Sequence, residues 1–304
     1  MIKAQSLSKK FRKKVAVNSL SFQVETGKVT GFLGPNGAGK STTMRLMLGL
    51  DNGQGSTTFD GKKLHDYQNP SRVVGILLEA KAFHPTRTAR SHLKVLAAEG
   101  GIAAQRVDEV LDIVGLKDVA KEKPGKFSLG MSQRLGIAAA ILGEPKYLIL
   151  DEPGNGLDPE GIAWLREFLR DYAKEGRGVF VSSHLLSEMS QLADNAVVIG
   201  RGKLIADTTM DKLIAGAGSA VFVRASNISA MEGALSKAGL TYEKSGKGLM
   251  VSAAKTDEIG MLAHESKITV LELSSHAASL EQAFLELTEG AAEYEANAGK
   301  AGKK

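Results

Sequence analysis

The feature that most constrains this chain is a glycine-rich loop, Gly-Pro-Asn-Gly-Ala-Gly-Lys-Ser-Thr, at residues 34–42. The apolar run Val29–Leu33 before the loop predicts a buried strand. The apolar spacing of residues 41–50 after it predicts a helix. A loop of the form G-x-x-x-x-G-K-[ST] between a strand and a helix is typical of nucleotide phosphate sites. The loop therefore predicts an α/β protein that binds a nucleoside triphosphate.

Each residue type in the loop contributes to phosphate binding in its own way. Glycines let the backbone turn tightly and bring its N–H groups close to phosphate oxygens. The positive end of the helix that starts near Lys40 favours the same oxygens. We expect Lys40 to reach the β- and γ-phosphates of the nucleotide and the Ser41 hydroxyl to bind Mg²⁺. The residues of the loop expected to bind nucleotide are Gly34, Asn36, Gly37, Ala38, Gly39, Lys40, Ser41 and Thr42.

Two acidic residues follow a second apolar run. Tyr147–Leu150 predicts a short buried strand, and Asp151 and Glu152 come directly after it. A carboxylate at the carboxyl end of a strand, beside a phosphate loop, lies where Mg²⁺ needs a ligand. We expect Asp151 to hold the metal through water. Glu152 should face the other way and polarise the attacking water.

The order of predicted elements indicates two domains and a tail. Residues 1–215 are expected to form the first domain. Within it, strands alternate with helices over residues 147–200, which implies a parallel sheet covered on both faces. Residues 86–143 are mostly helical and are expected to form an inserted helical subdomain. The order β-α-β-β-α-β over residues 219–288 predicts a small α+β, ferredoxin-like accessory domain. Residues 289–304 are expected to form a flexible tail.

A last helix is also expected within the accessory domain. Ser279 and Gln282 have the spacing of a capping box, with Ser279 as N-cap, and the helix they open should run to about Leu287.

Composition bounds the possible partners. No apolar run approaches the roughly 18 residues of a membrane helix, and the start Met-Ile-Lys-Ala lacks a signal-peptide core. The absence of cysteine fits a reducing cytoplasm. The net charge is +5, but residues 1–14 hold six basic residues and no acidic one. Because the rest of the chain is close to neutral, it has no broad cationic face, and no nucleic-acid partner is expected.

The segment Phe127–Arg134, Phe-Ser-Leu-Gly-Met-Ser-Gln-Arg, lies between the phosphate loop and the acidic strand. With these three motifs in this order, residues 1–215 resemble the ATP-binding subunit of an ABC transporter. Ser128 and Gly130 match the signature motif of that family. Leu129 and Met131 stand where Gly and Gln are usual, and the resulting SLGM form resembles the branch of drug and peptide-antibiotic exporters.

The resemblance implies further site residues. Phe11 matches the aromatic residue that stacks on adenine, and Asp158 belongs to a matching D-loop in which Asn155 replaces the usual Ser. His184 matches the switch histidine that contacts the γ-phosphate. Glu79 stands where the family usually has the Q-loop glutamine, which offers Mg²⁺ a neutral carbonyl. Glu79 either ligates the metal or turns away from it, and the sequence leaves both open.

The family resemblance implies a P-loop ABC-ATPase fold, a mixed sheet core with an inserted helical subdomain, and a mechanism. Two chains would form a homodimer around ATP and Mg²⁺, with Lys40 and Ser41 of one chain facing Ser128 and Gly130 of the other. ATP hydrolysis would drive a separate permease, docked near residues 80–90, at the cytoplasmic face of the cell membrane. The cargo implied is a drug, a peptide antibiotic or a similar amphipathic compound.

Two other functions are open at this stage. A non-transport ABC ATPase acting on DNA or the ribosome is disfavoured, because the chain has neither a second ATPase unit nor a long coiled-coil or zinc insertion. The other is a regulatory or resistance protein that clamps ATP without productive turnover.

Overall fold

The computed structural model describes residues 1–12, 14–183, 186–216, 219–252, 254–277 and 284. The described chain forms two compact units, which meet in sequence between Thr208 and Thr209. The sequence suggested a boundary near residue 215, whereas compactness assigns helix α7 (Met210–Gly216) to the second unit.

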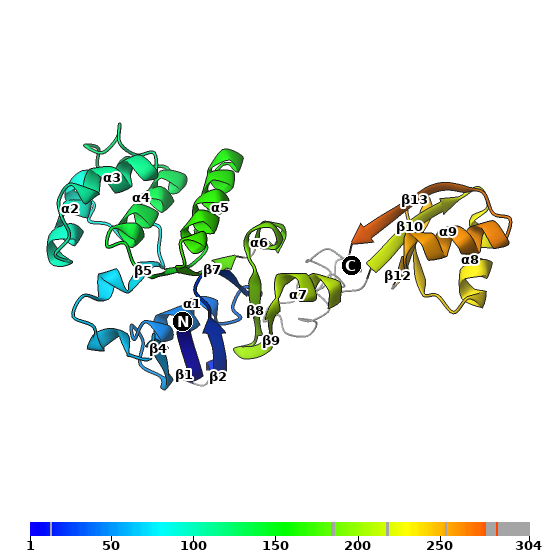
Figure 1. Ribbon diagram of the computed structural model, residues 1–304, viewed down its shortest axis with the longest axis horizontal. Coiled ribbons are helices and arrows are strands. Elements are labelled where there is room, and N and C mark those ends of the chain that lie inside the picture. The colour runs from blue at the N-terminus through cyan, green and yellow to red at the C-terminus, as the bar shows by residue number, and fades with distance from the viewer. Residues whose placement is uncertain (13, 184–185, 217–218, 253, 278–283, 285–304) are drawn as a thin grey trace, which may run out of the picture. The chain divides into compact units, whose positions relative to one another are not determined.

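A six-stranded sheet forms the centre of the first unit (Figure 1). β5, β6, β7, β3 and β8 run parallel to one another in that spatial order. β3 and β6 are buried along their whole length, as expected of strands covered on both faces. In spatial order the strands are β5 (Val74–Leu77), β6 (Tyr147–Leu150), β7 (Gly178–Ser183), β3 (Val29–Leu33), β8 (Asn195–Gly200) and β9 (Lys203–Thr209).

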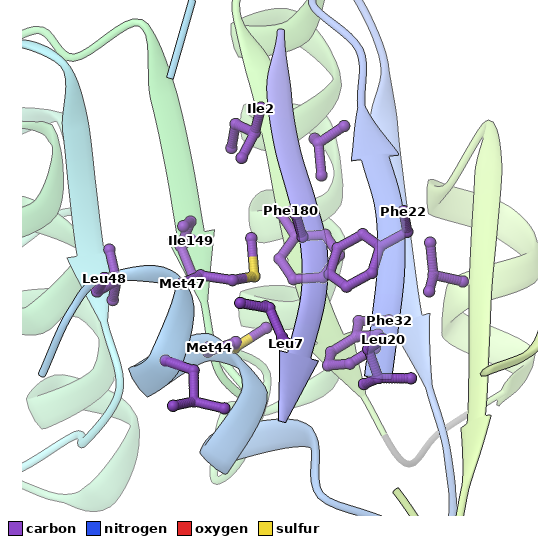
Figure 2. Close-up of a cluster of buried hydrophobic side chains, with 14 of the residues drawn as sticks. Ile2, Leu7, Leu20, Phe22, Phe32, Met44, Met47, Leu48, Ile149 and Phe180 are labelled. Atoms are coloured by element: carbon purple, nitrogen blue, oxygen red, sulfur yellow. The ribbon is translucent and has the colours of Figure 1, made fainter. Parts of the chain in front are cut away.

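A second, antiparallel sheet packs near one face of the central sheet, with a helix in the shared core. Its spatial order is β2-β1-β4. Side chains from both sheets meet in one hydrophobic cluster, where the rings of Phe22, Phe32 and Phe180 lie 4.9 to 5.7 Å apart (Figure 2). The elements are β1 (Ile2–Phe11), β2 (Lys14–Val24), β4 (Gln54–Phe59) and α1 (Lys40–Met47).

Two helices pack on β3 and β7 in the central sheet. They are α5 (Pro159–Lys174) and α6 (Leu186–Leu192). As expected, both faces of the central sheet are covered. Helices α5 and α6 cover one face, and the antiparallel sheet together with helix α1 covers the other. Strand β9 was not predicted from the sequence.

Three helices between β5 and β6 form the inserted helical subdomain (Figure 1). The Thr88 side chain accepts a hydrogen bond from Ser91 N at 3.1 Å and so caps the first of them at its N-terminus. Ser128 caps the third in the same way, accepting from Met131 N at 3.1 Å. The helices are α2 (Ala89–Glu99), α3 (Arg106–Ile113) and α4 (Leu129–Ile141).

The second unit has its own sheet and core. Its four antiparallel strands lie in the order β11-β12-β10-β13, and buried side chains of the sheet and of helices α8 and α9 form a separate hydrophobic cluster. This is the β-α-β-β-α-β arrangement expected from the sequence. The expected helix beginning at Ser279 and the tail lie outside the described residues. The elements are β10 (Ser219–Ala225), α8 (Ile228–Lys237), β11 (Tyr242–Ser245), β12 (Gly248–Ser252), α9 (Thr256–Glu265) and β13 (Val270–Ala277).

A polar cluster around Asp60 joins the two sheets of the first unit. Asp60 accepts hydrogen bonds from Lys146 Nζ at 2.8 Å, from Tyr147 Oη at 2.7 Å and from the amino terminus. Burial alone would raise the pKa of Asp60, but these hydrogen bonds outweigh it and bring the pKa to about 2. Because this is below the ordinary value of the unfolded chain, the charged form stabilises the fold.

We expect Asp60→Asn to lower the free energy of unfolding at neutral pH by about 1 kcal/mol, an amount reduced by the solvent that screens this partly exposed site. The difference should shrink as the pH falls below about 4 toward 2, where the native carboxylate is protonated. Urea unfolding of both proteins at several pH values measures it, with the exposed Asp118→Asn as control. Equal stability of the parent and Asp60→Asn at neutral pH would contradict the expectation.

Candidate functional site

The glycine-rich loop leaves the carboxyl end of β3, a strand that lies between β7 and β8. Helix α1 begins at Lys40, and Gly39, its N-cap, has a φ of 105°. A Cβ atom on Gly39 would lie 2.4 Å from the Ala16 carbonyl oxygen, and one on Gly34 would lie 2.7 Å from that of Ile199. Backbone packing therefore requires glycine at both positions, which fixes the path of the loop.

A pocket of about 550 Å³ opens beside this loop. Phe11, 48% exposed, stands at its wall, and Lys9 Nζ lies 4.8 Å from the centre of the Phe11 ring. An exposed ring at the wall of a pocket can stack on a flat base. The residues that line the pocket are Phe11, Lys14, Ala16, Pro35, Asn36, Gly37, Gly39, Lys40, Ser41, Thr42, Glu152 and Asn155.

Lys40 supplies the buried positive charge of the pocket. Its Nζ donates a hydrogen bond to the Gly34 carbonyl oxygen at 2.7 Å and lies 3.8 Å from Glu152 Oε1. Burial lowers the pKa of Lys40, and the nearby charges of Glu152 and Asp151 oppose that shift. A buried ammonium held mainly by loop carbonyls can exchange them for phosphate oxygens, which carry full negative charge.

The turn after β6 holds Asp151 and Glu152 in different surroundings: Asp151 is bonded to Ser182, and Glu152 lines the pocket. Ser182 Oγ on β7 donates to Asp151 Oδ1 at 2.5 Å and accepts from Glu152 N at 2.9 Å. Glu152 has a φ of 50°, in the left-handed region that residues other than glycine rarely adopt. Such a backbone costs of order 1–3 kcal/mol and persists only where surrounding contacts hold it. The turn thus directs the Glu152 carboxylate into the pocket.

The signature segment contacts this turn but does not line the pocket. A Cβ atom on Gly130 would lie 2.8 Å from the Gly156 carbonyl oxygen, so α4 and the turn after Glu152 are closely packed. Asp158 serves as N-cap of α5, accepting from Gly161 N at 2.8 Å. Among the described residues, neither Ser128, Gly130 nor Asp158 lines the phosphate pocket.

Glu79 lies beside a different pocket, of about 330 Å³, whose walls include Arg45, Phe83 and His92. The hydrogen bond to Asp51 raises the pKa of Arg45 most, and the charge of Glu79 adds to the effect. Burial lowers the pKa of His92, and the neighbouring Arg87 and His84 lower it further. This pocket therefore combines apolar walls with two charged side chains, Arg45 and Glu79.

Some residues expected at the phosphate pocket do not line it, and two residues that contact the acidic turn were not predicted from the sequence. Gly34 and Ala38 are buried members of the loop that do not line the pocket, and His184 lies outside the described residues. Ser182 and Gln133, which bond to the acidic turn, were not expected. No signal in the sequence marks either of them, because their partners are 30 and 19 positions away along the chain.

The sequence matches the ABC transporter family over residues 17–155 and a domain of unknown function over residues 219–281. It is 44% identical to the bacitracin transport ATP-binding protein of Bacillus licheniformis, over 70% of this chain and 71% of that protein. It is 39% identical to a lantibiotic transport ATP-binding protein of Streptococcus pyogenes, over 69% of this chain and 92% of the relative. An uncharacterised ABC transporter ATP-binding protein of Bacillus subtilis is 34% identical and matches 95% of this chain and 96% of its own length.

Solved structures agree on the fold. An ATP-binding subunit of an ABC transporter superposes with a TM-score of 0.64 at 28% identity, over 70% of this chain and 91% of the other. A dimeric bacterial ABC transporter cassette superposes with a TM-score of 0.63 at 21% identity, over 69% and 99%. In the described part of the chain, no helix is both long enough and apolar enough to cross a membrane. The resemblance drawn from the motifs is confirmed, and the chain belongs to the ATP-binding, ATP-hydrolysing subunits of ABC transporters.

Proposed function

We propose that two copies of this ATPase clamp ATP between them and drive a separate membrane permease. The observation that carries the proposal is the division of the site within one chain. The pocket holds the phosphate loop and Glu152, whereas Ser128 and Gly130 lie outside its lining among the described residues. In the dimer, ATP on Lys40 and Ser41 of one chain meets Ser128 and the Gly130 amide of its partner.

This arrangement lets ATP perform work. Moving a two-state equilibrium from 1:99 to 99:1 requires about 5.5 kcal/mol of differential binding. A ligand clamped between two chains binds only the closed state in full, so it can supply that difference. Hydrolysis with Glu152 as general base, and with His184 on the γ-phosphate, removes the bridging contacts. The dimer then opens, and the permease resets.

The donor set of the pocket suits Mg²⁺. No cluster of three or more acidic, histidine or cysteine side chains occurs in the described residues. Mg²⁺ needs no such cage, because it takes one or two protein oxygens together with substrate phosphates and waters. The Ser41 hydroxyl, which lines the pocket, would supply one of those oxygens. The Asp151 carboxylate, which Ser182 holds directly before Glu152 and outside the pocket lining, would supply another. The bound ion would neutralise phosphate charge.

Glu79 is proposed as a further metal ligand on its family position alone, since it lines the second pocket and not the phosphate pocket. We expect Glu79→Gln to raise the Mg²⁺ concentration needed for half-maximal ATPase activity about tenfold, because an amide oxygen attracts the cation less than a carboxylate does. A Mg²⁺ titration of the ATPase rate measures the shift. Exposed Glu99→Gln is the control. An unchanged Mg²⁺ requirement in Glu79→Gln would remove Glu79 from the metal shell.

The permease is expected to dock on the second pocket. Ala80, Ala82 and Phe83 line it and fall within the segment 80–90 identified from the sequence. Its apolar walls suit a helix end from a membrane protein, which would hold the chain peripherally at the cytoplasmic face of the membrane. The relatives named for bacitracin and lantibiotic transport support export of a peptide antibiotic or a similar amphipathic compound.

The test is an ATPase assay with a candidate permease in lipid vesicles. We expect the permease to stimulate the parental rate. Phe83→Ala should lose most of the stimulation and keep its basal rate, because it trims the docking pocket and leaves the phosphate pocket unchanged. Val95→Ala, an exposed position on α2, is the control.

A second test uses living cells. Cells carrying the parental ATPase and the permease should tolerate more bacitracin than cells carrying Phe83→Ala and the permease. Salt-dependent binding to DNA or RNA without permease stimulation would favour a non-transport ATPase.

A further inference from the structure

Gln133 is a buried glutamine on α4 that has no part in the function described so far. Its residue is 4% exposed, and its Nε2 donates a hydrogen bond to the Glu152 carbonyl oxygen at 3.0 Å. Because a carbonyl can only accept, the NH₂ group must face Glu152 and the Oε1 atom must point away. Within the described chain Oε1 accepts no hydrogen bond. An unpaired buried acceptor lowers stability, so stability alone does not explain a glutamine here.

The hydrogen bond from Gln133 completes a set of contacts that fixes one peptide segment. The Glu152 carbonyl oxygen also accepts from Asn155 N at 3.2 Å, and Glu152 N donates to Ser182 Oγ at 2.9 Å. Glu152 is therefore held on both its N–H and its C=O side. Since its φ of 50° is unfavourable for a glutamate, these contacts maintain a conformation that the turn would otherwise leave.

The same contact connects the signature helix to the pocket. Gly130, one turn earlier on α4, packs against the Gly156 carbonyl oxygen, so α4 contacts the acidic turn at two points. The Glu152 carboxylate, 3.8 Å from Lys40 Nζ, lies on the pocket side of that turn. A shift of α4 would thus move the Glu152 backbone through Gln133.

We propose that Gln133 is a positioning residue for ATP hydrolysis. Its amide holds the Glu152 carbonyl in place from the signature helix, and this keeps the Glu152 carboxylate aligned in the phosphate pocket. Gln133 does not line the pocket and acts only through Glu152. The proposal rests on the role of Glu152 as general base, so Glu152→Gln is measured beside every variant.

The first variant is Gln133→Met, which keeps the length of the side chain and removes both polar atoms. We expect kcat to fall about 10- to 100-fold, because a misplacement of about 1 Å at a reacting group costs up to about 10²-fold. KM for ATP and the ATP affinity should stay within about twofold, since the phosphate loop is unchanged. The melting temperature should be equal or higher, because the variant no longer buries an unpaired oxygen. Gln191→Met, at an exposed position on α6, is the matched control.

The second variant, Gln133→Glu, adds a pH readout that simple packing damage would not produce. Ionised glutamate cannot donate to the Glu152 carbonyl, whereas protonated glutamic acid can. Burial raises the pKa of such a group, so part of it is protonated near neutral pH. We expect kcat of Gln133→Glu, relative to the parent, to rise as the pH falls from about 8 to about 6. Dividing by the parental profile removes the titration of Asp151, Glu152 and Lys40, which both proteins share.

Each result bears on a stated claim. A parental kcat in Gln133→Met, with Glu152→Gln inactive, would overturn the positioning role and leave the general base intact. A fall in kcat accompanied by an equal rise in KM and a lower melting temperature would also overturn it, because that pattern indicates general damage. A flat relative pH profile in Gln133→Glu would exclude hydrogen-bond donation as the cause. If Glu152→Gln turned over at the parental rate, the assignment of the general base itself would fail.

Discussion

Glu152→Gln should lower the steady-state ATPase rate by roughly 10²- to 10⁴-fold, the contribution usual for a general base. The substitution keeps the size of the side chain and removes its ability to take a proton from water. Glu152 forms part of the pocket wall and lies 3.8 Å from Lys40 Nζ, so loss of its charge changes the chemistry more than the shape. ATP affinity should stay close to the parental value, and an ATP-bound dimer should accumulate.

The rate is measured by phosphate release and the dimer by size-exclusion chromatography with ATP. Glu160→Gln, an exposed change in the first turn of α5, provides the control. Turnover at the parental rate would show that another group activates the water. Loss of turnover without dimer accumulation would retain the general base and contradict the clamp.

Lys40→Ala should weaken ATP binding by about 10- to 100-fold, because a hydrogen bond to a charged group contributes about 1.5–3 kcal/mol and each 1.4 kcal/mol is a factor of ten. The Lys40 side chain is buried, and its ammonium donates a hydrogen bond to the Gly34 carbonyl oxygen at 2.7 Å. Burial disfavours its charge, as the lowered pKa shows. We therefore expect the variant to lose affinity and not thermal stability.

Isothermal titration calorimetry measures the affinity. Lys28→Ala serves as control, since Lys28 forms an exposed ion pair with Glu25 at 2.7 Å in the turn between β2 and β3. Unchanged affinity in Lys40→Ala would remove the phosphate-loop assignment, whatever the family of the chain.

The sequence predicted the strands and helices whose ends are marked by proline or by helix-capping residues. The strand predicted at Tyr147–Leu150 has the observed bounds, and Pro145 precedes it. Asp158 and Pro159 are residue types typical of a helix start, and helix α5 begins there. Strand β9 was missed because its side chains are half-buried or exposed and mostly lack the apolar alternation that identifies a strand.

Long-range contacts account for what the sequence could not predict at the site. The motifs identified Asp151 and Glu152, but not the left-handed backbone of Glu152, since a glutamate gives no local sign of a positive φ. The bonds from Ser182 and Gln133 depend on how β7 and α4 pack against the turn. Tertiary structure alone brings these residues together.

The nucleotide pocket has walls from two sheets, and this has a consequence for selectivity. Phe11, Lys14 and Ala16 come from the antiparallel sheet, whereas the phosphate loop follows β3 of the central sheet. The rings of Phe22 and Phe32 connect the two sheets beneath. Substitutions on the antiparallel sheet can thus change the preference for purine over pyrimidine nucleotides without changing the affinity for the triphosphate. Base preference and phosphate affinity can therefore vary independently among related chains.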